Sequence, residues 1–363
     1  MFHFQLMLII DYYHRFYVTF FIIFHYHFNF FCFFSSEKTI TKMLNTRGVY
    51  RGFLITTSII YLIFVIFSFI AYHGGSPAFP MTFNQVSDTY VMEITPTSRI
   101  FILWTINVVY QCIWLIYCLV NIFRGGSEAT IQSSQTIMAF LGYTLTGIIW
   151  LFTWTHGNLS LSLVLIVLGQ FLLDICYGYA CEDLHYYLRY YAITLDNIRD
   201  VWCHRMLIQN GIMFSAAWNT VWSFLTMASF FRWELGTESY ATSLGALALL
   251  GVAMVVWFIL ENTLLKEHTQ FTFSHYIVLV GSFISIHRRT RQSDDDEYGI
   301  STLVIGLLGI TCVLLFTRLV ILFFKSYERK KPVGEKYALR NRQIRPDASG
   351  STSVKVYRSF TAF

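Results

Sequence analysis

Long apolar runs constrain this chain more than any other feature of its sequence. Eight segments are apolar over the length, about 18 residues or more, that crosses a bilayer as a helix. They lie at 52–72, 99–122, 136–154, 159–179, 206–231, 241–261, 270–287 and 300–324. A backbone in lipid must satisfy its hydrogen bonds within its own segment, so runs of this length form helices. We therefore predict an all-α, multi-pass transmembrane helical bundle of about eight spans, in contact with a lipid bilayer.

Composition excludes an ordinary soluble protein. The 363 residues are 55% hydrophobic and 13% charged, whereas soluble chains are about 25% charged. The net charge of +5 has two unequal sources. Residues 325–363 hold ten Lys or Arg against three acids, and the remaining 324 residues hold 16 against 18. Because the basic charge belongs to a tail beside a membrane and not to a folded face, we expect no nucleic-acid partner.

The positions of lysine and arginine orient the bundle. With eight spans, the start of the first run and the tail lie on one side, which holds nineteen Lys or Arg against five on the other. The positive-inside rule makes the richer side cytoplasmic. We therefore predict a transmembrane helical domain over 43–324 and a basic, disordered cytoplasmic tail over 325–363. The sequence does not indicate which membrane holds the protein, and it is compatible with a homo-oligomer.

The N-terminal segment 1–42 needs a separate interpretation. Residues 1–34 contain fifteen Phe or Tyr, and charged residues such as Asp11 and Arg15 interrupt what would otherwise be a span. No small-residue cleavage site of a signal peptide follows. Two interpretations stay open: an extra helix or anchor, or a gene-model artefact that precedes a translation start at Met43.

No catalytic or metal-binding signature is present in the sequence. We find no Gly-rich phosphate loop, no His-Glu-x-x-His and no Gly-x-Ser-x-Gly. The seven cysteines are odd in number and lack metal-type spacing. The cluster of Glu182, Asp183 and His185 lies among tyrosines that are typical of a membrane interface. We therefore predict that the protein is not an enzyme and has no metal site and no cofactor.

Ionisable residues inside the predicted spans suggest a buried polar site. These are Asp174, His275 and Arg318, and burial in lipid is costly unless such groups are paired. Asp174 and Arg318 either pair with each other as a structural connection, or Arg318 extends toward the basic end of its span. The same three residues would form the relay of an alternative function, a proton-coupled secondary transporter. A seven-helix-type receptor is a further alternative, which requires an odd number of spans.

Three predicted spans carry tryptophans and small polar residues along one helix face. The residues of these stripes are Trp104, Asn107, Gln111, Trp114 and Cys118, then Tyr143, Gly147, Trp150 and Trp154, and then Ser215, Trp218, Asn219 and Trp222. Polar side chains in a spanning helix face other helices or a cavity. The stripes are compatible with ordinary helix packing, and also with a cavity for a flat, mostly apolar ligand.

Several segments resemble the TspO/MBR family of tryptophan-rich sensory and translocator proteins. Around the second predicted span, Ile94–Thr95–Pro96 precedes Phe101 and Trp104, and the segment Tyr110–Gln–Cys–Ile–Trp–Leu–Ile–Tyr117 follows. Further segments that resemble the family surround Trp150 and Trp154 and run from Met206 to Trp222. The chain differs in having Val108 where the family usually has Tyr, and in having more than the five spans of short members. It is identified as a distant, extended member.

The resemblance implies a helical bundle that binds, and transports or senses, a hydrophobic small molecule such as a porphyrin-like tetrapyrrole or a sterol. Stacking surface would come from the indoles, and hydrogen bonds from the amides. The expected ligand-binding residues are Trp104, Asn107, Gln111, Trp114, Trp150, Trp154, Trp218, Asn219 and Trp222.

Overall fold

The computed structural model describes residues 47–74, 76–123, 131–190, 198–291 and 298–329. Within these residues the chain is helical, and the only β-type pairing is an isolated bridge between Ser76 and Phe79. The predicted segment 1–42 and the tail beyond residue 329 lie outside the described residues.

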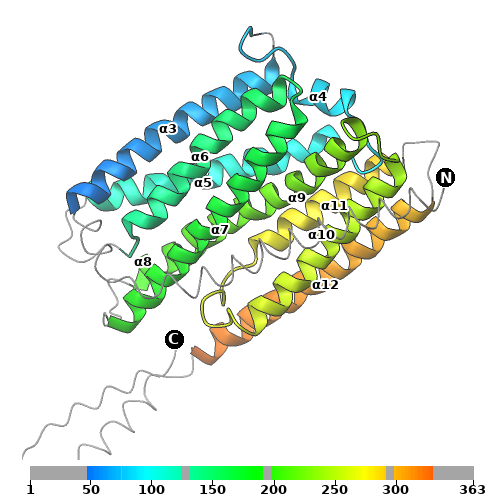
Figure 1. The fold of residues 1–363 in the computed structure, drawn as a ribbon. Coiled ribbons are helices and arrows are strands. Elements are labelled where there is room, and N and C mark those ends of the chain that lie inside the picture. Colours follow the sequence, from blue (N-terminus) through cyan, green and yellow to red (C-terminus); the bar gives the residue numbers. More distant parts are fainter. Residues whose placement is uncertain (1–46, 75, 124–130, 191–197, 292–297, 330–363) are drawn as a thin grey trace, which may run out of the picture.

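Among the described residues, eight long helices form the bundle (Figure 1). They are α3 (Arg47–His73), α5 (Phe101–Phe123), α6 (Ser134–Thr155), α7 (Leu159–Tyr190), α9 (Asn210–Trp233), α10 (Ser239–Asn262), α11 (Ser274–Thr290) and α12 (Tyr298–Arg329). Each of the eight predicted runs lies within or mostly within one of these helices. The prediction of an all-α, multi-pass helical bundle is confirmed. Helix α12 continues past residue 324 into the segment predicted as tail.

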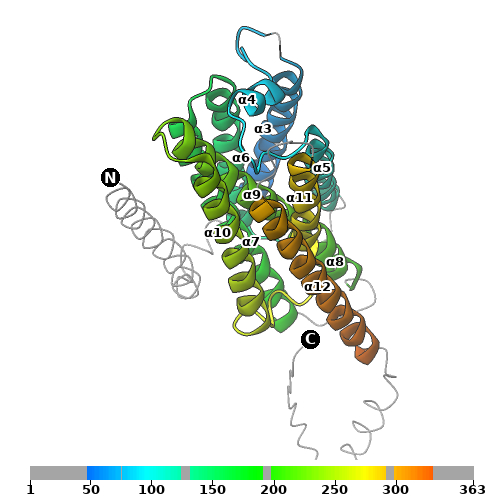
Figure 2. The ribbon, with the colours of Figure 1, turned by 90° about the vertical axis from the view of Figure 1, so that its right-hand side faces the viewer.

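Six of these helices, α3, α5, α6, α7, α10 and α12, are long and apolar enough to cross a membrane, by length and composition. The other two predicted spans are the helices α9 and α11. Helix α11 has only 17 residues, whereas α9 has 24 but carries many polar side chains. Helix α9 contacts α5, α7, α10 and α11 and lies between them (Figure 2). Because protein and not lipid surrounds most of α9, its sequence does not need to be as apolar as that of an outer helix.

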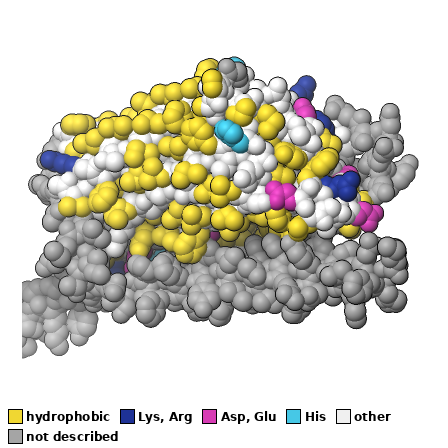
Figure 3. All heavy atoms as spheres, turned by 45° about the horizontal axis from the view of Figure 1, so that its top comes forward, with side chains coloured by type: hydrophobic (Ala, Val, Ile, Leu, Met, Phe, Trp, Pro, Cys, Tyr) yellow, Lys and Arg dark blue, Asp and Glu magenta, His cyan; other side chains and the backbone are white. Residues whose placement is uncertain are grey.

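The outer helices expose large apolar side chains. Phe69 of α3 and Phe316 of α12 are examples, and side chains of this kind form yellow ridges along one face of the bundle (Figure 3). An apolar surface of this extent is unfavourable in water and matches the hydrocarbon of a bilayer. The protein is therefore an integral, multi-pass membrane protein.

Short elements close the two ends of the bundle. One end carries α4 (Phe83–Thr89) and the 3₁₀ turn η2 (Ser98–Ile100), and we name residues 83–97 the strap and this end the strap end. The opposite end carries α8 (Ile198–Cys203), the π-helical turn η3 (His204–Gln209) and the 263–273 loop. We name it the tail end, because α12 finishes there (Figure 1).

Local sequence sets where several helices begin. Thr82 and Gln85 form a reciprocal capping box at the start of α4. The α6–α7 turn needs Gly157, whose φ of +71° favours glycine. The Asn158 side chain then accepts a hydrogen bond from the amide of Leu161 at 3.0 Å and caps α7. This tight turn places α6 and α7 side by side at the strap end.

Candidate functional site

Five tryptophans from three helices meet below the strap, and we name them the aromatic cluster. Ring centroids are 5.8 Å apart for Trp104 and Trp218, 5.7 Å for Trp218 and Trp222, and 6.0 Å for Trp222 and Trp154. Trp150 stacks on Trp154 at 5.6 Å with nearly parallel planes. These distances lie in the range of favourable aromatic pairs. The structure thus brings together five of the predicted site residues, from α5, α6 and α9.

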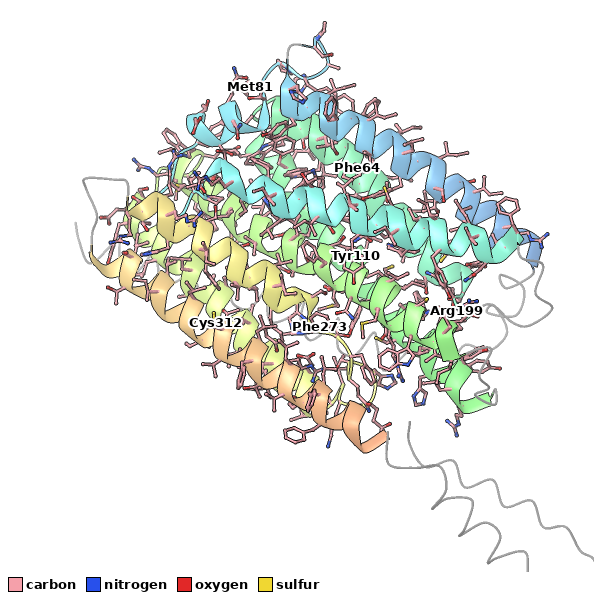
Figure 4. All side chains as sticks on the ribbon, turned by 180° about the vertical axis from the view of Figure 1, so that it is seen from behind. Phe64, Met81, Tyr110, Arg199, Phe273 and Cys312 are labelled. Atoms are coloured by element: carbon pink, nitrogen blue, oxygen red, sulfur yellow. The ribbon has the colours of Figure 1, made fainter. Side chains whose placement is uncertain are left out.

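Phenylalanines extend the cluster toward α3 and the strap. Phe64 of α3 contacts Trp104 edge-on at 5.8 Å, and Phe64 is labelled in Figure 4. Phe83 of the strap lies 5.7 Å from Trp150. The aromatic cluster is therefore part of the packed interior and is continuous with the segment that covers it.

The sixth predicted tryptophan, Trp114, occupies a different environment. It is fully buried and packs edge-on against Phe140 at 4.9 Å. Its indole N–H donates to the Gln111 side chain, which in turn donates to Asn107 at 3.0 Å and to the Gly211 carbonyl at 2.8 Å. Gln111, held by Trp114, therefore connects α5 to α9 through hydrogen bonds.

The two asparagines of the predicted ligand set also connect helices. Asn107 accepts a hydrogen bond from Ser215 of α9 at 2.8 Å. Asn219 donates to the Ile166 carbonyl at 2.9 Å and to Gln170 of α7 at 3.2 Å. Buried amides are stable only when their hydrogen bonds are made, and here other helices make them. These contacts favour helix packing as the role of the amides.

The aromatic cluster contains indole N–H donors that have no hydrogen-bond acceptor among the described residues. Within the described residues, the buried indole N–H groups of Trp150, Trp154 and Trp222 have no hydrogen-bond partner. A buried donor without an acceptor costs about 1–3 kcal/mol. Three such groups on one set of contacting rings form a mostly apolar surface that can still donate hydrogen bonds.

A small cavity adjoins two of these indoles. Trp154 and Trp222 line it from below and strap residues line it from above, and its volume is about 20 Å³. That volume holds about one water molecule, whereas binding sites for small molecules measure about 300–1,000 Å³. The expectation of an open cavity between the stripes is therefore not met. The indoles pack against one another and fill the space that a ligand would occupy.

The strap is held over the cavity by hydrogen bonds from several helices. Glu93 accepts from Ser239 at 2.7 Å and from Ser243 at 2.6 Å, both on α10. Tyr90, in the middle of the strap, donates to the Gly157 carbonyl at 3.1 Å, and at the C-terminal end of the strap the hydroxyl groups of Thr97 and Ser285 lie 2.9 Å apart. A larger ligand can reach the aromatic cluster from this end only if some of these bonds open.

A second buried site lies at the tail end and joins α10, α11 and α12. Glu261 forms an ion pair with Arg318 at 2.6 Å, accepts from the Tyr276 hydroxyl at 2.9 Å and lies 3.6 Å from His275 Nε2. Glu261, Arg318 and His275 are 0%, 2% and 3% exposed. We name Glu261, Arg318, His275 and Tyr276 together the ionic cluster. A buried pair of this kind needs further hydrogen bonds to offset the loss of hydration.

Arg318 obtains those bonds from the 263–273 loop. Its guanidinium donates to the Thr272 carbonyl at 3.1 Å and to the Thr269 carbonyl. Both interpretations of Arg318 from the sequence are wrong, because Arg318 neither extends out of its span nor pairs with Asp174. Glu261 was missed, although an acid as the last residue of an apolar run is a signal that could have found it.

Asp174 lies in a separate polar group on α7. The Gln170 amide donates to Asp174 at 3.0 Å, and the Gln170 oxygen accepts from Thr220 of α9 at 3.1 Å. The three residues of the predicted relay therefore divide between this group and the ionic cluster. No group of three or more His, Cys, Asp or Glu among the described residues could hold a metal ion.

No protein-family model, curated protein or solved structure matches this chain. The resemblance to the TspO/MBR family therefore stays a prediction.

Proposed function

We propose that this membrane protein binds a flat, mostly apolar small molecule that carries hydrogen-bond acceptors, at the aromatic cluster below the strap. The observation that carries the proposal is the set of unpaired indole N–H groups of Trp150, Trp154 and Trp222. Buried polar groups in folded proteins nearly always have partners, so an exception needs an explanation. A ligand with carbonyl, carboxylate or ring-nitrogen acceptors would supply the missing partners.

The shape of the site supports an aromatic or polycyclic ligand. The cluster supplies aromatic surface from Trp104, Trp154 and Trp218. A tetrapyrrole or a sterol-like ketone combines an extended apolar body with peripheral acceptors. The resemblance to TspO/MBR implies the same ligand class. Transport and sensing both begin with this binding step, and the proposal covers that step alone.

Binding requires a conformational change, because the cavity of about 20 Å³ is too small for such a molecule. The strap is the segment that must move, since it forms the upper wall of the cavity and connects to α10 and α11 through a few side-chain hydrogen bonds. Loops that open and close over a ligand move on timescales of microseconds to milliseconds.

The test is a titration of the purified full chain in nanodiscs with protoporphyrin IX, followed by the shift of the porphyrin absorption band. Ligand absorbance is preferable to tryptophan fluorescence, because the variants change the fluorophore itself. Trp154→Phe and Trp222→Phe each keep an aromatic ring and remove one unpaired N–H. We expect saturable binding to the wild type and about tenfold weaker binding to each variant.

Trp257→Phe is the matched control, because the Trp257 indole N–H is also buried with no partner among the described residues, but it lies beside His275 at the tail end. We expect its affinity to equal that of the wild type. Equal binding by all three variants, or binding no greater than to empty nanodiscs, would overturn the proposal. A parallel titration with a sterol ketone, followed by calorimetry, separates the two ligand classes.

A further inference from the structure

A groove of about 330 Å³ lies on the outside of the bundle at the tail end, between α3 and α5. Arg51 and Ile55 of α3 and Leu119, Ile122 and Phe123 of α5 line it. Its volume is at the lower end of the range for small-molecule sites. It is far from the aromatic cluster, which lies toward the opposite end of the same helices.

The groove is charged at one end and apolar beyond it. Arg51 lies near the start of α3, at the level where the apolar run of that helix begins, and Ile55 lies one turn deeper. On α5, Leu119 lies deeper than Phe123, which is 79% exposed. Among the described residues, Arg51 makes no ion pair, and no acid lines the groove. An occupant therefore meets a cation near the membrane surface and apolar walls toward the membrane interior.

The charge of the groove selects its occupant. Tail-end residues are on the side predicted to be cytoplasmic, where anionic lipids concentrate and basic residues attract them. A second copy of this chain docked by a two-fold axis through the groove would place Arg51 of one copy near Arg51 of the other, which like-charge repulsion disfavours.

We propose that this groove is a binding site for an anionic phospholipid, with the lipid phosphate on Arg51 and one acyl chain along Ile55, Leu119 and Ile122. Guanidinium groups bind phosphate through two parallel hydrogen bonds. In the groove, the acyl chain of that lipid contacts two helices at once, whereas on a smooth part of the surface it would contact one. The site is independent of the function proposed for the aromatic cluster.

The first experiment measures lipid selectivity by native mass spectrometry of the full chain with phosphatidylserine or phosphatidylcholine. Two variants address the two halves of the site: Arg51→Gln removes the charge, and Ile55→Trp fills the apolar part while it keeps the charge. We expect one phosphatidylserine bound selectively by the wild type and a loss of about tenfold in its affinity for each variant.

Arg99→Gln is the control, because Arg99 is an exposed arginine at the strap end. We expect it to bind phosphatidylserine as the wild type does. A loss in Arg51→Gln without a loss in Ile55→Trp would show diffuse attraction to a basic surface and would overturn the groove site. Competition by glycerophosphoserine, which lacks acyl chains, at the same concentration as the lipid would reassign the site to a free phosphate group and also overturn it.

A second experiment identifies the occupant directly. A photo-reactive benzoylphenylalanine in place of Ile55 is illuminated in nanodiscs that contain phosphatidylserine, and the product is analysed by mass spectrometry. We expect a phospholipid adduct. An adduct with another segment of this chain, or with a second copy, would show that protein fills the groove and would contradict the proposal.

Discussion

The two buried sites of this bundle solve the problem of polar groups in a membrane in opposite ways. At the tail end, Glu261 and Arg318 carry full charges, yet the ion pair, Tyr276 and the loop carbonyls engage them. At the strap end, the indoles are uncharged, yet three N–H groups have no acceptor among the described residues. Each charged group of the pair is therefore engaged, whereas unused hydrogen-bonding capacity lies on uncharged groups: the three indoles at the strap end and, beside the ion pair, the ring nitrogens of His275.

This difference separates a structural role from a binding role. A charge left unpaired in a low-dielectric interior costs far more than an unpaired indole N–H, so the Glu261–Arg318 pair must be satisfied for the bundle to fold. An unpaired N–H costs only about 1–3 kcal/mol, which a bundle of this size can accommodate. Capacity for a ligand can remain only where the cost of leaving a group unpaired is small.

Breaking the ionic cluster should have the largest effect. In Arg318→Met, Glu261 is left buried without its cation, and we expect a loss of about 3–5 kcal/mol. The measurement is thermal unfolding of the purified protein in detergent. Asp174→Asn is the control, because its amide can still accept the bond from Gln170, and we expect a smaller loss. An Arg318→Met variant as stable as the wild type would contradict the structural role of the pair.

The double variant Glu261→Leu/Arg318→Met sharpens this test. Removing both charges leaves no buried ion, so part of the stability should return relative to either single variant. The recovery should be incomplete, because Arg318 also bonds the carbonyls of Thr269 and Thr272. Losses that simply add in the double variant would show that the two residues act independently.

Acid should weaken the tail end through His204 of η3. Burial is the main cause that lowers the pKa of His204 to about 4; the adjacent charge of Arg205 contributes to the shift, and the bond to the Ala180 carbonyl opposes it. That carbonyl requires a proton on Nε2, and the buried Nδ1 has no hydrogen-bond partner in the part of the chain that the structure describes, so the folded state holds the neutral ring. This contribution to stability is present above pH of about 6.5 and is lost as pH falls toward 4.

The expected loss is at most about 3 kcal/mol by pH 4, from a shift of about 2.5 pKa units. Unfolding of the wild type and of His204→Gln is compared between pH 8 and pH 4, because glutamine can still donate to the Ala180 carbonyl and does not titrate here. The free energy of unfolding of the wild type should fall relative to that of the variant by this amount between pH 8 and pH 4. Parallel curves would show that His204 is hydrated in the folded protein.

Loosening the strap should have a smaller effect on stability and a clear effect on access. Glu93→Ala removes two hydrogen bonds to a carboxylate, from Ser239 and Ser243, and we expect a loss of about 1–2 kcal/mol. Acrylamide quenching of tryptophan fluorescence should increase, because Trp154 and Trp222 lie directly below the strap. Ser223→Ala is the control, since Ser223 donates to the Asn219 carbonyl within α9 and not to the strap. Unchanged quenching would exclude the strap as the route to the cluster.

Removing an unpaired donor should have the smallest effect. In Trp222→Phe, relief of the unsatisfied N–H offsets part of the packing that is lost, so the net change should be below about 1 kcal/mol. Trp114→Phe is the contrast, because that indole N–H donates to Gln111 and its loss leaves a buried acceptor unpaired. We expect it to be less stable than Trp222→Phe by about 1–3 kcal/mol in thermal unfolding. Equal losses would indicate that Trp222 has a partner after all.

Much of the fold was predictable, because apolar runs are local signals. Each run needs only its own residues to indicate a helix, and all eight runs correspond to helices. The meeting of Trp104, Trp154 and Trp222 also followed from helix faces, since a polar or aromatic stripe turns away from lipid. The interior position of α9 was not evident, although its high content of Ser, Asn and Trp is the signal of a helix surrounded by protein.

The partners of individual polar groups were not predictable in the same way. Asn107 and Asn219 have the composition of ligand-binding residues, but their bonds go to α9 and α7. Arg318 pairs with an acid at the end of α10 and not with Asp174. Each partner is far away in sequence, so the choice depends on helix rotation and on the length of the 263–273 loop.

The sequence by itself determined that this is an all-α membrane protein with aromatic helix faces turned inward, because hydrophobicity and its period act along single segments. Only the tertiary structure decided that the aromatic faces pack closed under a strap, that Glu261 joins Arg318, and that the amides bind other helices. The physical reason is that a pair forms where two side chains meet in space, and packing of all the helices together sets that meeting.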